Sequence, residues 1–259
     1  MKASVIIPVF NERDSLSLVV SDIPRGLVSD IVVVDNGSTD GTDLVAQRLT
    51  ESGGPSGPAN RLEISGGPCG PPNPPPVRLV RESRRGYGSA CLAGLAALEA
   101  SPPDVVVFLD GDYSDHPEEM PELLSAIDRG ADLVIGSRTL GRRERGALLP
   151  QARLGNLLAC VLIRLLYGHR YTDLGPFRAI RWDACRRLGM CDPDFGWTCE
   201  MQVKALREGL SVTEVPVSYR RRVGVSKITG TLSGTLRAGF KILWTILRHR
   251  SRKGVRREA

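Results

Sequence analysis

Two aspartates separated by one glycine, Asp110-Gly111-Asp112, directly follow an apolar stretch over residues 105–109. That stretch contains three β-branched residues and predicts a strand buried on both faces. Residues i and i+2 of an extended chain point the same way, so we expect Asp110 and Asp112 to converge on one point. The glycine between them lets a ligand approach the backbone closely. Two hard oxygen ligands suit Mg²⁺ or Mn²⁺, especially a cation that also binds diphosphate oxygens.

An isolated Asp-Gly-Asp sequence is also common in solvated surface turns, so the elements around it decide between the two interpretations. Four apolar stretches predict buried strands: 4–7, 30–34, 105–109 and 132–135. Pro8 stops the first and Glu12 follows it, the second ends at Asp35, and the fourth leads to Arg138. Helical segments between them predict a mostly parallel α/β sheet, in which ligands bind beyond the carboxyl ends of the strands. The acidic groups gathered at those ends favour the metal site.

A glycine pair, Gly86 and Gly88, precedes a helix of small residues predicted over 90–100. The free N–H groups and the positive dipole end of such a helix suit a phosphate or a ribose. By itself this pair is a weak signal, and Gly86 is predicted to contact a nucleotide only in the context of the acidic strand ends.

The second half of the chain is less regular, and its helices carry apolar faces. Helices are predicted over 154–167, 201–207 and 232–247. Residues 172–180 are predicted to be a turn that enters a strand, and residues 212–219 a strand. Pro216 places the last strand near an edge of the sheet. Basic residues flank the first and third helices, so these helices could meet a membrane interface or pack on the sheet.

Composition limits the class of protein. The chain has 259 residues, 41% of them hydrophobic and 25% charged, as in a soluble globular protein. Its net charge of +6 is concentrated in patches that suit phosphate groups, an anionic membrane or nucleic acid. The six cysteines lack zinc spacing, which predicts reduced thiols in the cytoplasm. No signal peptide is visible, and no apolar run reaches the roughly 20 residues of a membrane span.

Two domains of unequal size are predicted. Residues 1–227 are predicted to form one α/β domain, within which we expect the Gly/Pro-rich stretch 51–76 to be a mobile surface insertion. Residues 228–259 form an amphipathic helix and a basic tail.

Three motifs in this order resemble the family 2 inverting glycosyltransferases of GT-A fold: residues 8–12 (Pro-Val-Phe-Asn-Glu), 35–42 (Asp-Asn-Gly-Ser-Thr-Asp-Gly-Thr) and 110–112. Residues 175–179 and 222–227 are similar to the polyprenyl-phosphate branch, which includes dolichyl-phosphate mannose and glucose synthases. Many such synthases add C-terminal membrane spans, and this chain departs from them there and in its Gly/Pro-rich insertion. The resemblance implies a Rossmann-like, mostly parallel sheet flanked by helices.

The resemblance also implies roles. The enzyme would move a hexose from a UDP- or GDP-linked sugar to an acceptor, with polyprenyl phosphate favoured and Mg²⁺ or Mn²⁺ as cofactor. The implied residues are Glu200 and Asp112 for catalysis, Asp110 and Asp112 for the metal, Pro8, Glu12, Asp35, Gly86, Asp110 and Arg138 for the nucleotide-sugar, and Arg178, Arg222 and Lys227 for acceptor phosphate. Glu200 matches the position of the family's general base, although a phosphate acceptor needs a base less than a hydroxyl does.

Other functions remain open on the sequence. The acceptor could be the hydroxyl of a soluble molecule or glycan. A sugar-phosphate nucleotidyltransferase should carry a glycine-rich basic loop after the first strand, and residues 8–12 contain none. A nucleic-acid-binding protein should carry aromatic platforms or a groove-reading helix, and only 5% of residues are aromatic. We therefore expect a cytoplasmic enzyme, peripheral to the membrane if its acceptor is a lipid.

Overall fold

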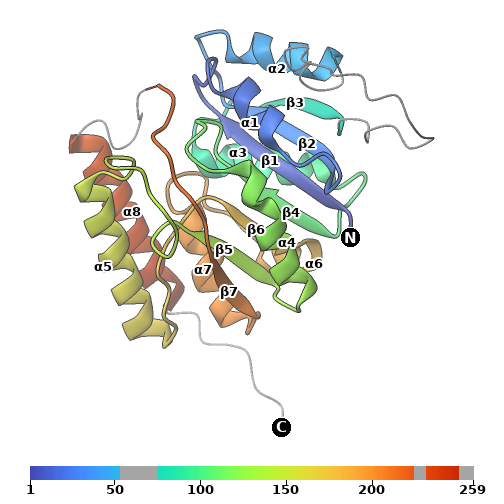
Figure 1. Cartoon of the computed structure of the whole chain (residues 1–259). Helices are drawn as coiled ribbons and strands as arrows, with labels where there is room; N and C mark the ends of the chain where they lie inside the picture. The colour runs from blue at the N-terminus through green and yellow to red at the C-terminus, as the bar shows by residue number, and fades with distance from the viewer. Residues whose placement is uncertain (53–74, 225–231, 251–259) are drawn as a thin grey trace.

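A computed structural model describes residues 1–52, 75–224 and 232–250 (Figure 1). The strands are β1 (Ala3–Val9), β2 (Val28–Asp35), β3 (Val77–Arg81), β4 (Val105–Phe108), β5 (Leu133–Ser137), β6 (Arg178–Arg181) and β7 (Val212–Pro216). The helices are α1 (Leu16–Asp22), α2 (Thr42–Glu51), α3 (Tyr87–Leu98), the short 3₁₀ helix η1 (Pro117–Glu119), α4 (Met120–Asp128), α5 (Pro150–Tyr167), α6 (Trp182–Leu188), α7 (Trp197–Arg207) and α8 (Leu232–Arg250).

The strands form one sheet in the order β3-β2-β1-β4-β6-β5-β7. All neighbouring pairs are parallel except those of β6, which runs antiparallel between β4 and β5. Helices cover both faces of this sheet (Figure 1). The predicted mostly parallel α/β fold is therefore confirmed, and β7 lies at an edge as Pro216 indicated.

Successive residues of the central strands enter two separate cores. In β1, Val5 and Ile7 pack under α1 and α4, whereas Ile6 points to the opposite face, which α3 and the later helices cover. Phe108 of β4 also lies in the second core, with its ring edge against Trp197 of α7. Burial on both faces explains why these strands are continuous apolar runs in the sequence.

Strand β1 continues through Pro8, which the sequence predicted to end it. Pro8 pairs with Val34 of β2, but the pairing of β1 with β4 has already ended at Ile6 and Phe108. Residue 8 therefore lies beyond the hydrogen-bonded pairing with β4, where a backbone N–H is not needed, and a proline is tolerated. Helix α6 was not predicted at all.

Helix α8 packs against α5 and α7, so the C-terminal helical segment joins the layer on the α3 side of the sheet (Figure 1). The predicted domain boundary at residue 227 and most of the predicted insertion at 51–76 lie outside the described residues. Across the part of the chain that the structure describes, no helix has the length and apolar content that crossing a membrane demands.

Candidate functional site

A pocket of about 410 Å³ opens at the carboxyl ends of β1 and β4. Its wall comes from the segments after β1, β2 and β4, from the start of α3, and from the segments before α7 and after β7. These strands adjoin where the order of the sheet switches direction, and such a switch point is the usual ligand site of an open α/β sheet. Six of the predicted site residues line the pocket: Pro8, Glu12, Gly86, Asp110, Asp112 and Arg222.

The two aspartates after β4 both reach this pocket. Asp112 is 2% exposed, and its Oδ1 accepts the backbone N–H of Ser114 at 2.9 Å. Asp110 Oδ1 is buried without a hydrogen-bond donor among the described residues, whereas the buried Asp112 Oδ2 faces the guanidinium of Arg222. Burial raises the pKa of Asp110, and the positive charge of Arg222 lowers it in part. Asp110 Oδ1 thus lacks a partner that a cation could supply, beside an Asp112 carboxylate that Arg222 already contacts.

These oxygens fit a divalent cation of the Mg²⁺ type. Such an ion is typically bound by one or two carboxylates, several waters and the phosphates of a substrate, without a complete cage of protein ligands. Accordingly, no cluster of three or more His, Cys, Asp or Glu side chains within the described ranges is arranged to hold a metal. Asp110 and Asp112 are the residues that would hold the cation.

Gly111 has a structural reason of its own. A Cβ at this position would lie 2.5 Å from Cγ1 of Val9. The glycine therefore lets the end of β4 pack tightly on β1, in addition to lining the pocket. The sequence argument had explained the same glycine by the approach of a ligand.

Arg222 meets the carboxylates directly, because its guanidinium forms an ion pair with Asp112 Oδ2. The backbone N–H of Val223 also donates to the carbonyl oxygen of Asp112 at 3.0 Å. The segment after β7 is thereby attached to the loop after β4. Arg222, predicted as an acceptor-phosphate ligand, lies in the same pocket as the metal carboxylates, while Lys227 lies outside the described residues.

The opposite wall contains an aromatic and a cationic side chain that the sequence argument did not select. The guanidinium of Arg85 lies 4.2 Å from the centre of the Phe10 ring, and both residues line the pocket. Glu12 lies beside them, and its backbone N–H donates to Oγ1 of Thr42 at 2.8 Å. A flat, partly cationic surface of this kind suits an aromatic base.

The start of α3 packs tightly against segment 192–194. Gly86 has φ +135°, and its N–H donates to Oδ1 of Asn36 at 2.8 Å. A Cβ at Gly88 would lie 1.9 Å from the carbonyl oxygen of Asp192, and the Ser89 N–H donates to the Pro193 carbonyl at 2.8 Å. The glycines thus bring α3 against segment 192–194, and two of the N–H groups expected to bind phosphate are already bonded.

Asp35, predicted to contact the nucleoside, lies behind the wall. It is 5% exposed, and its carboxylate accepts the Ser38 N–H at 3.2 Å, which fixes the turn after β2. Asn36 takes the wall position, and its amide also donates to the carbonyl of Arg84 at 2.8 Å. The sequence predicted a turn after β2, but it did not show that the side chain of Asn36, and not that of Asp35, lines the pocket.

Glu200, predicted as the general base, is not among the residues that line the pocket. It is 1% exposed, and Oε2 accepts the backbone N–H of Asp192 at 2.8 Å while Oε1 pairs with Lys204 at 2.7 Å. Burial opposes its ionisation, but these bonds and those of Cys191 lower the pKa of Glu200. Its geometry is that of a residue that holds segment 191–194 in place.

Asp194, two residues beyond Asp192, is the carboxylate that lines the pocket on this side. Burial and the charge of Asp192 raise the pKa of Asp194. The residue belongs to a short irregular segment before α7, where neither periodicity nor a motif distinguishes it.

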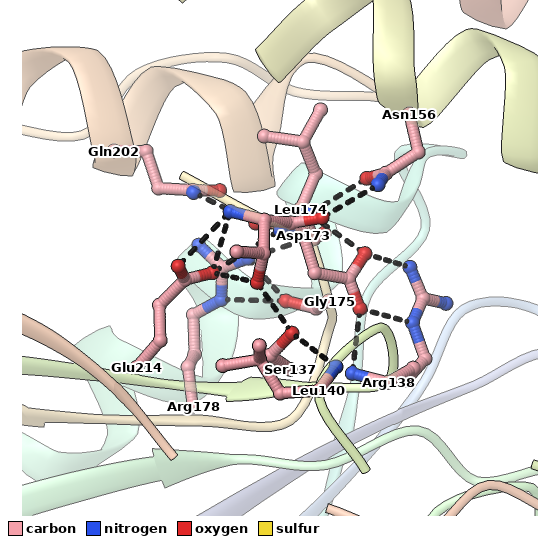
Figure 2. Close-up of polar contacts among 11 residues, drawn as sticks. Ser137, Arg138, Leu140, Asn156, Asp173, Leu174, Gly175, Arg178, Gln202 and Glu214 are labelled. Atoms are coloured by element: carbon pink, nitrogen blue, oxygen red, sulfur yellow. Dashed lines mark hydrogen bonds and ion pairs between the residues drawn. The ribbon is translucent and has the colours of Figure 1, made fainter. Parts of the chain in front are cut away.

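Arg138, predicted to bind the diphosphate, forms a buried ion pair with Asp173 (Figure 2). Its Nε and a terminal nitrogen donate to the two oxygens of Asp173, each at 2.8 Å. The Asp173 side chain is 0% exposed, and the Arg138 side chain is 12% exposed. Although burial opposes the charge, Arg138 lowers the pKa of Asp173. The bidentate pair ties the end of β5 to segment 172–175.

Arg178 is equally removed from the pocket. It is fully buried on β6 and donates to the backbone carbonyl of Gly175 (Figure 2). It also donates to the backbone carbonyl of Thr198 at 2.9 Å. Burial lowers the pKa of Arg178. With its donors directed at backbone carbonyls, Arg178 has the geometry of a structural residue, in place of the predicted contact with acceptor phosphate.

Comparisons with known proteins agree with this geometry. Residues 4–189 match the family model described as Glycosyl transferase family 2. The chain is 34% identical over 247 residues to polyprenol monophosphomannose synthase of Mycolicibacterium smegmatis, covering 92% of this chain and 84% of the relative. It is 30% identical over 263 residues to undecaprenyl-phosphate mannosyltransferase of Micrococcus luteus, covering 96% and 99%.

Solved structures share the fold. Glucosyl-3-phosphoglycerate synthase of Mycobacterium tuberculosis, in a complex with Mn²⁺, UDP and glucosyl-3-phosphoglycerate, superposes with a TM-score of 0.67. The comparison covers 98% of this chain and 81% of the other, with 22% sequence identity. At this identity the likeness establishes the GT-A arrangement of the elements.

Proposed function

Because the chain belongs to glycosyl transferase family 2 and is a glycosyltransferase, we propose that it moves a hexose from a UDP- or GDP-linked sugar to polyprenyl phosphate. The transfer inverts the anomeric carbon and depends on Mg²⁺ or Mn²⁺. The observation that carries the proposal is the pair Asp110 and Asp112, whose carboxylates line one pocket at the switch point of the sheet and of which Asp110 Oδ1 is buried without a hydrogen-bond donor among the described residues.

The donor lies along the pocket in this proposal. Its base stacks beside Phe10 and Arg85, and Glu12 accepts N–H groups of uracil or guanine. A cation held by Asp110 and Asp112 would neutralise the charge that builds on the departing diphosphate. Arg222 contacts the same phosphates and supplies fixed positive charge where the bond to the sugar breaks.

The acceptor approaches from the side of segment 192–195, opposite the leaving group. Polyprenyl phosphate is supported by the names of the two curated relatives, both of which specify a polyprenyl phosphate and mannose. A phosphate oxygen is already an anion, so attack on the anomeric carbon requires no proton transfer. A lipid-linked acceptor would also require the enzyme to meet a bilayer surface.

One observation favours the alternative acceptor, a hydroxyl of a soluble molecule or glycan. Asp194 lines the pocket, and burial raises its pKa toward the range in which a carboxylate accepts a proton effectively. A hydroxyl acceptor would need this base, whereas a phosphate acceptor would not. Asp194 therefore distinguishes the two acceptors.

The test is a transfer assay with UDP- and GDP-linked hexoses, Mg²⁺ or Mn²⁺, and either polyprenyl phosphate or a panel of soluble hydroxyl acceptors. The proposal expects transfer to polyprenyl phosphate that Asp112→Asn abolishes and that Asp194→Asn retains within about tenfold, since base catalysis is worth 10²–10⁴-fold where it operates. Transfer only to hydroxyl acceptors, lost in Asp194→Asn, would establish the alternative. The absence of metal-dependent transfer or hydrolysis of any nucleotide-sugar would refute both.

A further inference from the structure

Helices α5 and α8 lie side by side at one end of the molecule (Figure 1). Each exposes an apolar stripe at helical spacing. The exposed residues are Leu154, Leu157, Leu158, Val161 and Leu165 of α5, and Phe240, Leu243, Trp244 and Leu247 of α8. We call this set the α5–α8 face. Its most exposed members, Leu165 at 75% and Phe240 at 72%, retain most of their accessible surface.

These stripes are additional to the sides by which the helices join the protein. In α5, Ala159, Cys160 and Ile163 are buried in the core. In α8, Ile246 is buried, and its carbonyl accepts the hydroxyl of Tyr167 at 2.6 Å. Both helices are therefore apolar on the inner and the outer side. A helix of this kind normally has a partner on each side, and a contiguous exposed apolar surface marks an interaction site.

A groove of about 660 Å³ borders the same face, between α5 and the segments before and after it. Four arginines line it: Arg143, Arg153, Arg164 and Arg170. None of the four forms a salt bridge or a side-chain hydrogen bond to another described residue. The described residues of the lining include no acidic side chain, and Leu154, Leu157 and Val161 give the groove an apolar side.

We propose that the α5–α8 face and this arginine groove dock on an anionic phospholipid bilayer. The leucines, Phe240 and Trp244 enter the interfacial layer, and the groove arginines meet lipid phosphates. This arrangement has the composition of interfacial helices, with Leu, Phe and Trp on the buried side and arginines at the level of the headgroups. The bilayer fits better than a second copy of the chain, because lipid phosphates supply the negative charge that the groove needs, whereas its described lining offers a second copy no acidic side chain.

The inference rests on the proposed function in one respect: an enzyme that uses a lipid-linked acceptor must reach a membrane surface. Docking itself is measured without any sugar transfer. The two proposals can therefore fail independently: a protein that docks without transferring to polyprenyl phosphate, or transfers without docking, separates them.

The experiment is sedimentation of the full chain with vesicles of phosphatidylcholine alone or of equal parts phosphatidylcholine and phosphatidylglycerol. We expect binding to the anionic vesicles that weakens as salt is raised. Trp244 provides a signal, since it is 51% exposed whereas Trp182 and Trp197 are buried. Its emission should shift to the blue with anionic vesicles, and Trp244→Phe should remove that shift while sedimentation persists.

Matched substitutions locate the surface. Arg153→Gln and Arg164→Gln should each weaken binding about fivefold, since a basic residue near an anionic surface contributes about 1 kcal/mol. Arg25→Gln, an exposed arginine far from the face in sequence, should leave binding unchanged. Leu165→Ser should weaken binding several-fold. Leu44→Ser should not, because Leu44 is an exposed leucine of α2, at 55%, outside the α5–α8 face. All variants change exposed side chains, and thermal unfolding confirms that they fold.

Four results would overturn the proposal. The first is equal binding, or none, with the two vesicle types. The second is an equal effect of the α5 substitutions and their controls. The third is a stable dimer in solution that Leu165→Ser dissociates, since the face would then belong to a second copy. Protection from unfolding by inorganic phosphate without vesicle binding would likewise assign the groove to soluble anions.

Discussion

Replacing Arg138 by methionine separates the role that the sequence suggested, contact with the diphosphate, from the role that the geometry gives. The Asp173 side chain is 0% exposed and is paired at both oxygens with Arg138. Arg138→Met leaves that carboxylate buried without its counter-charge, a change that typically costs 3–5 kcal/mol. The backbone N–H groups of residues 138 and 174 still bond to Asp173, each at 2.8 Å, so we expect the lower end, about 3 kcal/mol. For a chain of this size the melting temperature should fall by roughly 6–12 °C.

The assay is urea and thermal unfolding of the wild type, Arg138→Met, Asp173→Asn and the double variant, with nucleotide affinity measured in parallel. The double variant should lose less than the sum of the single losses, because it removes both charges. Arg142→Met, on an exposed arginine four residues away, should change stability by less than about 0.5 kcal/mol.

The free energy of unfolding of the wild type relative to these variants should depend on pH, because Asp173 is ionised in the folded protein. Arg138 holds the pKa of Asp173 below its ordinary value, although burial opposes the charge. The folded protein therefore keeps the carboxylate ionised, and its stabilising effect is complete above the unfolded pKa of about 4 and is lost as the pH falls below it. The advantage of the wild type over Asp173→Asn should shrink on acidification. Unchanged unfolding of Arg138→Met, with nucleotide affinity reduced instead, would refute the reasoning and return Arg138 to the diphosphate site.

Three further predictions concern the pocket and its support. Glu200→Gln should lower the melting temperature, because it weakens the bonds that hold segment 191–194, whereas Asp194→Asn should not; equal thermal effects would contradict the distinction. Gly88→Ala should lower the free energy of unfolding by about 1–3 kcal/mol and weaken nucleotide binding, because a Cβ would lie 1.9 Å from a backbone oxygen. In the control Gly155→Ala the new Cβ meets nothing within 4 Å, so the free energy of unfolding should stay the same or rise by up to about 1 kcal/mol. Burial raises the pKa of Asp115 to about 8, so between about pH 4 and 8 the unfolded chain releases a proton that the folded chain keeps. The free energy of unfolding, measured in EDTA, should therefore fall across this pH range in the wild type and not in Asp115→Asn.

The sheet and the metal carboxylates could be predicted because both follow from local pattern. Strands such as 105–109 are buried on both faces and are therefore apolar throughout, and parallel strands bring their carboxyl ends to one edge. This geometry is enough to place Asp110, Asp112, Glu12 and Pro8 around one pocket.

The arginines and Glu200 could not be assigned in the same way, because their role depends on partners distant in sequence. Arg138 meets Asp173, 35 residues away, and Arg178 meets the carbonyl of Thr198, 20 residues away. A guanidinium that pairs with a buried carboxylate and one that pairs with a phosphate have the same residue type and a similar position after a strand. Asp194 lies just before α7 and lines the pocket, whereas Glu200 lies in the first turn of α7 and does not. The sequence does not show which of the two carboxylates reaches the pocket.

The glycines have a packing role that the sequence argument did not foresee. Gly86, Gly88 and Gly111 were attributed to ligand approach or free N–H groups. A Cβ at these positions would instead meet Pro193, Asp192 and Val9 at 2.2, 1.9 and 2.5 Å. Close approach of one backbone segment to another leaves the same trace in a sequence as close approach of a ligand.

The central claim is that Asp110 and Asp112 bind a nucleotide diphosphate through a divalent cation, and calorimetric titration of UDP and GDP with and without Mn²⁺ tests it most directly. For the wild type, the account predicts binding of one of the two nucleotides that Mn²⁺ strengthens at least about tenfold, or about 1.4 kcal/mol. In Asp112→Asn that strengthening should disappear while the protein remains folded. Binding that is indifferent to Mn²⁺ in the wild type, or equally strengthened by Mn²⁺ in Asp112→Asn, would contradict it.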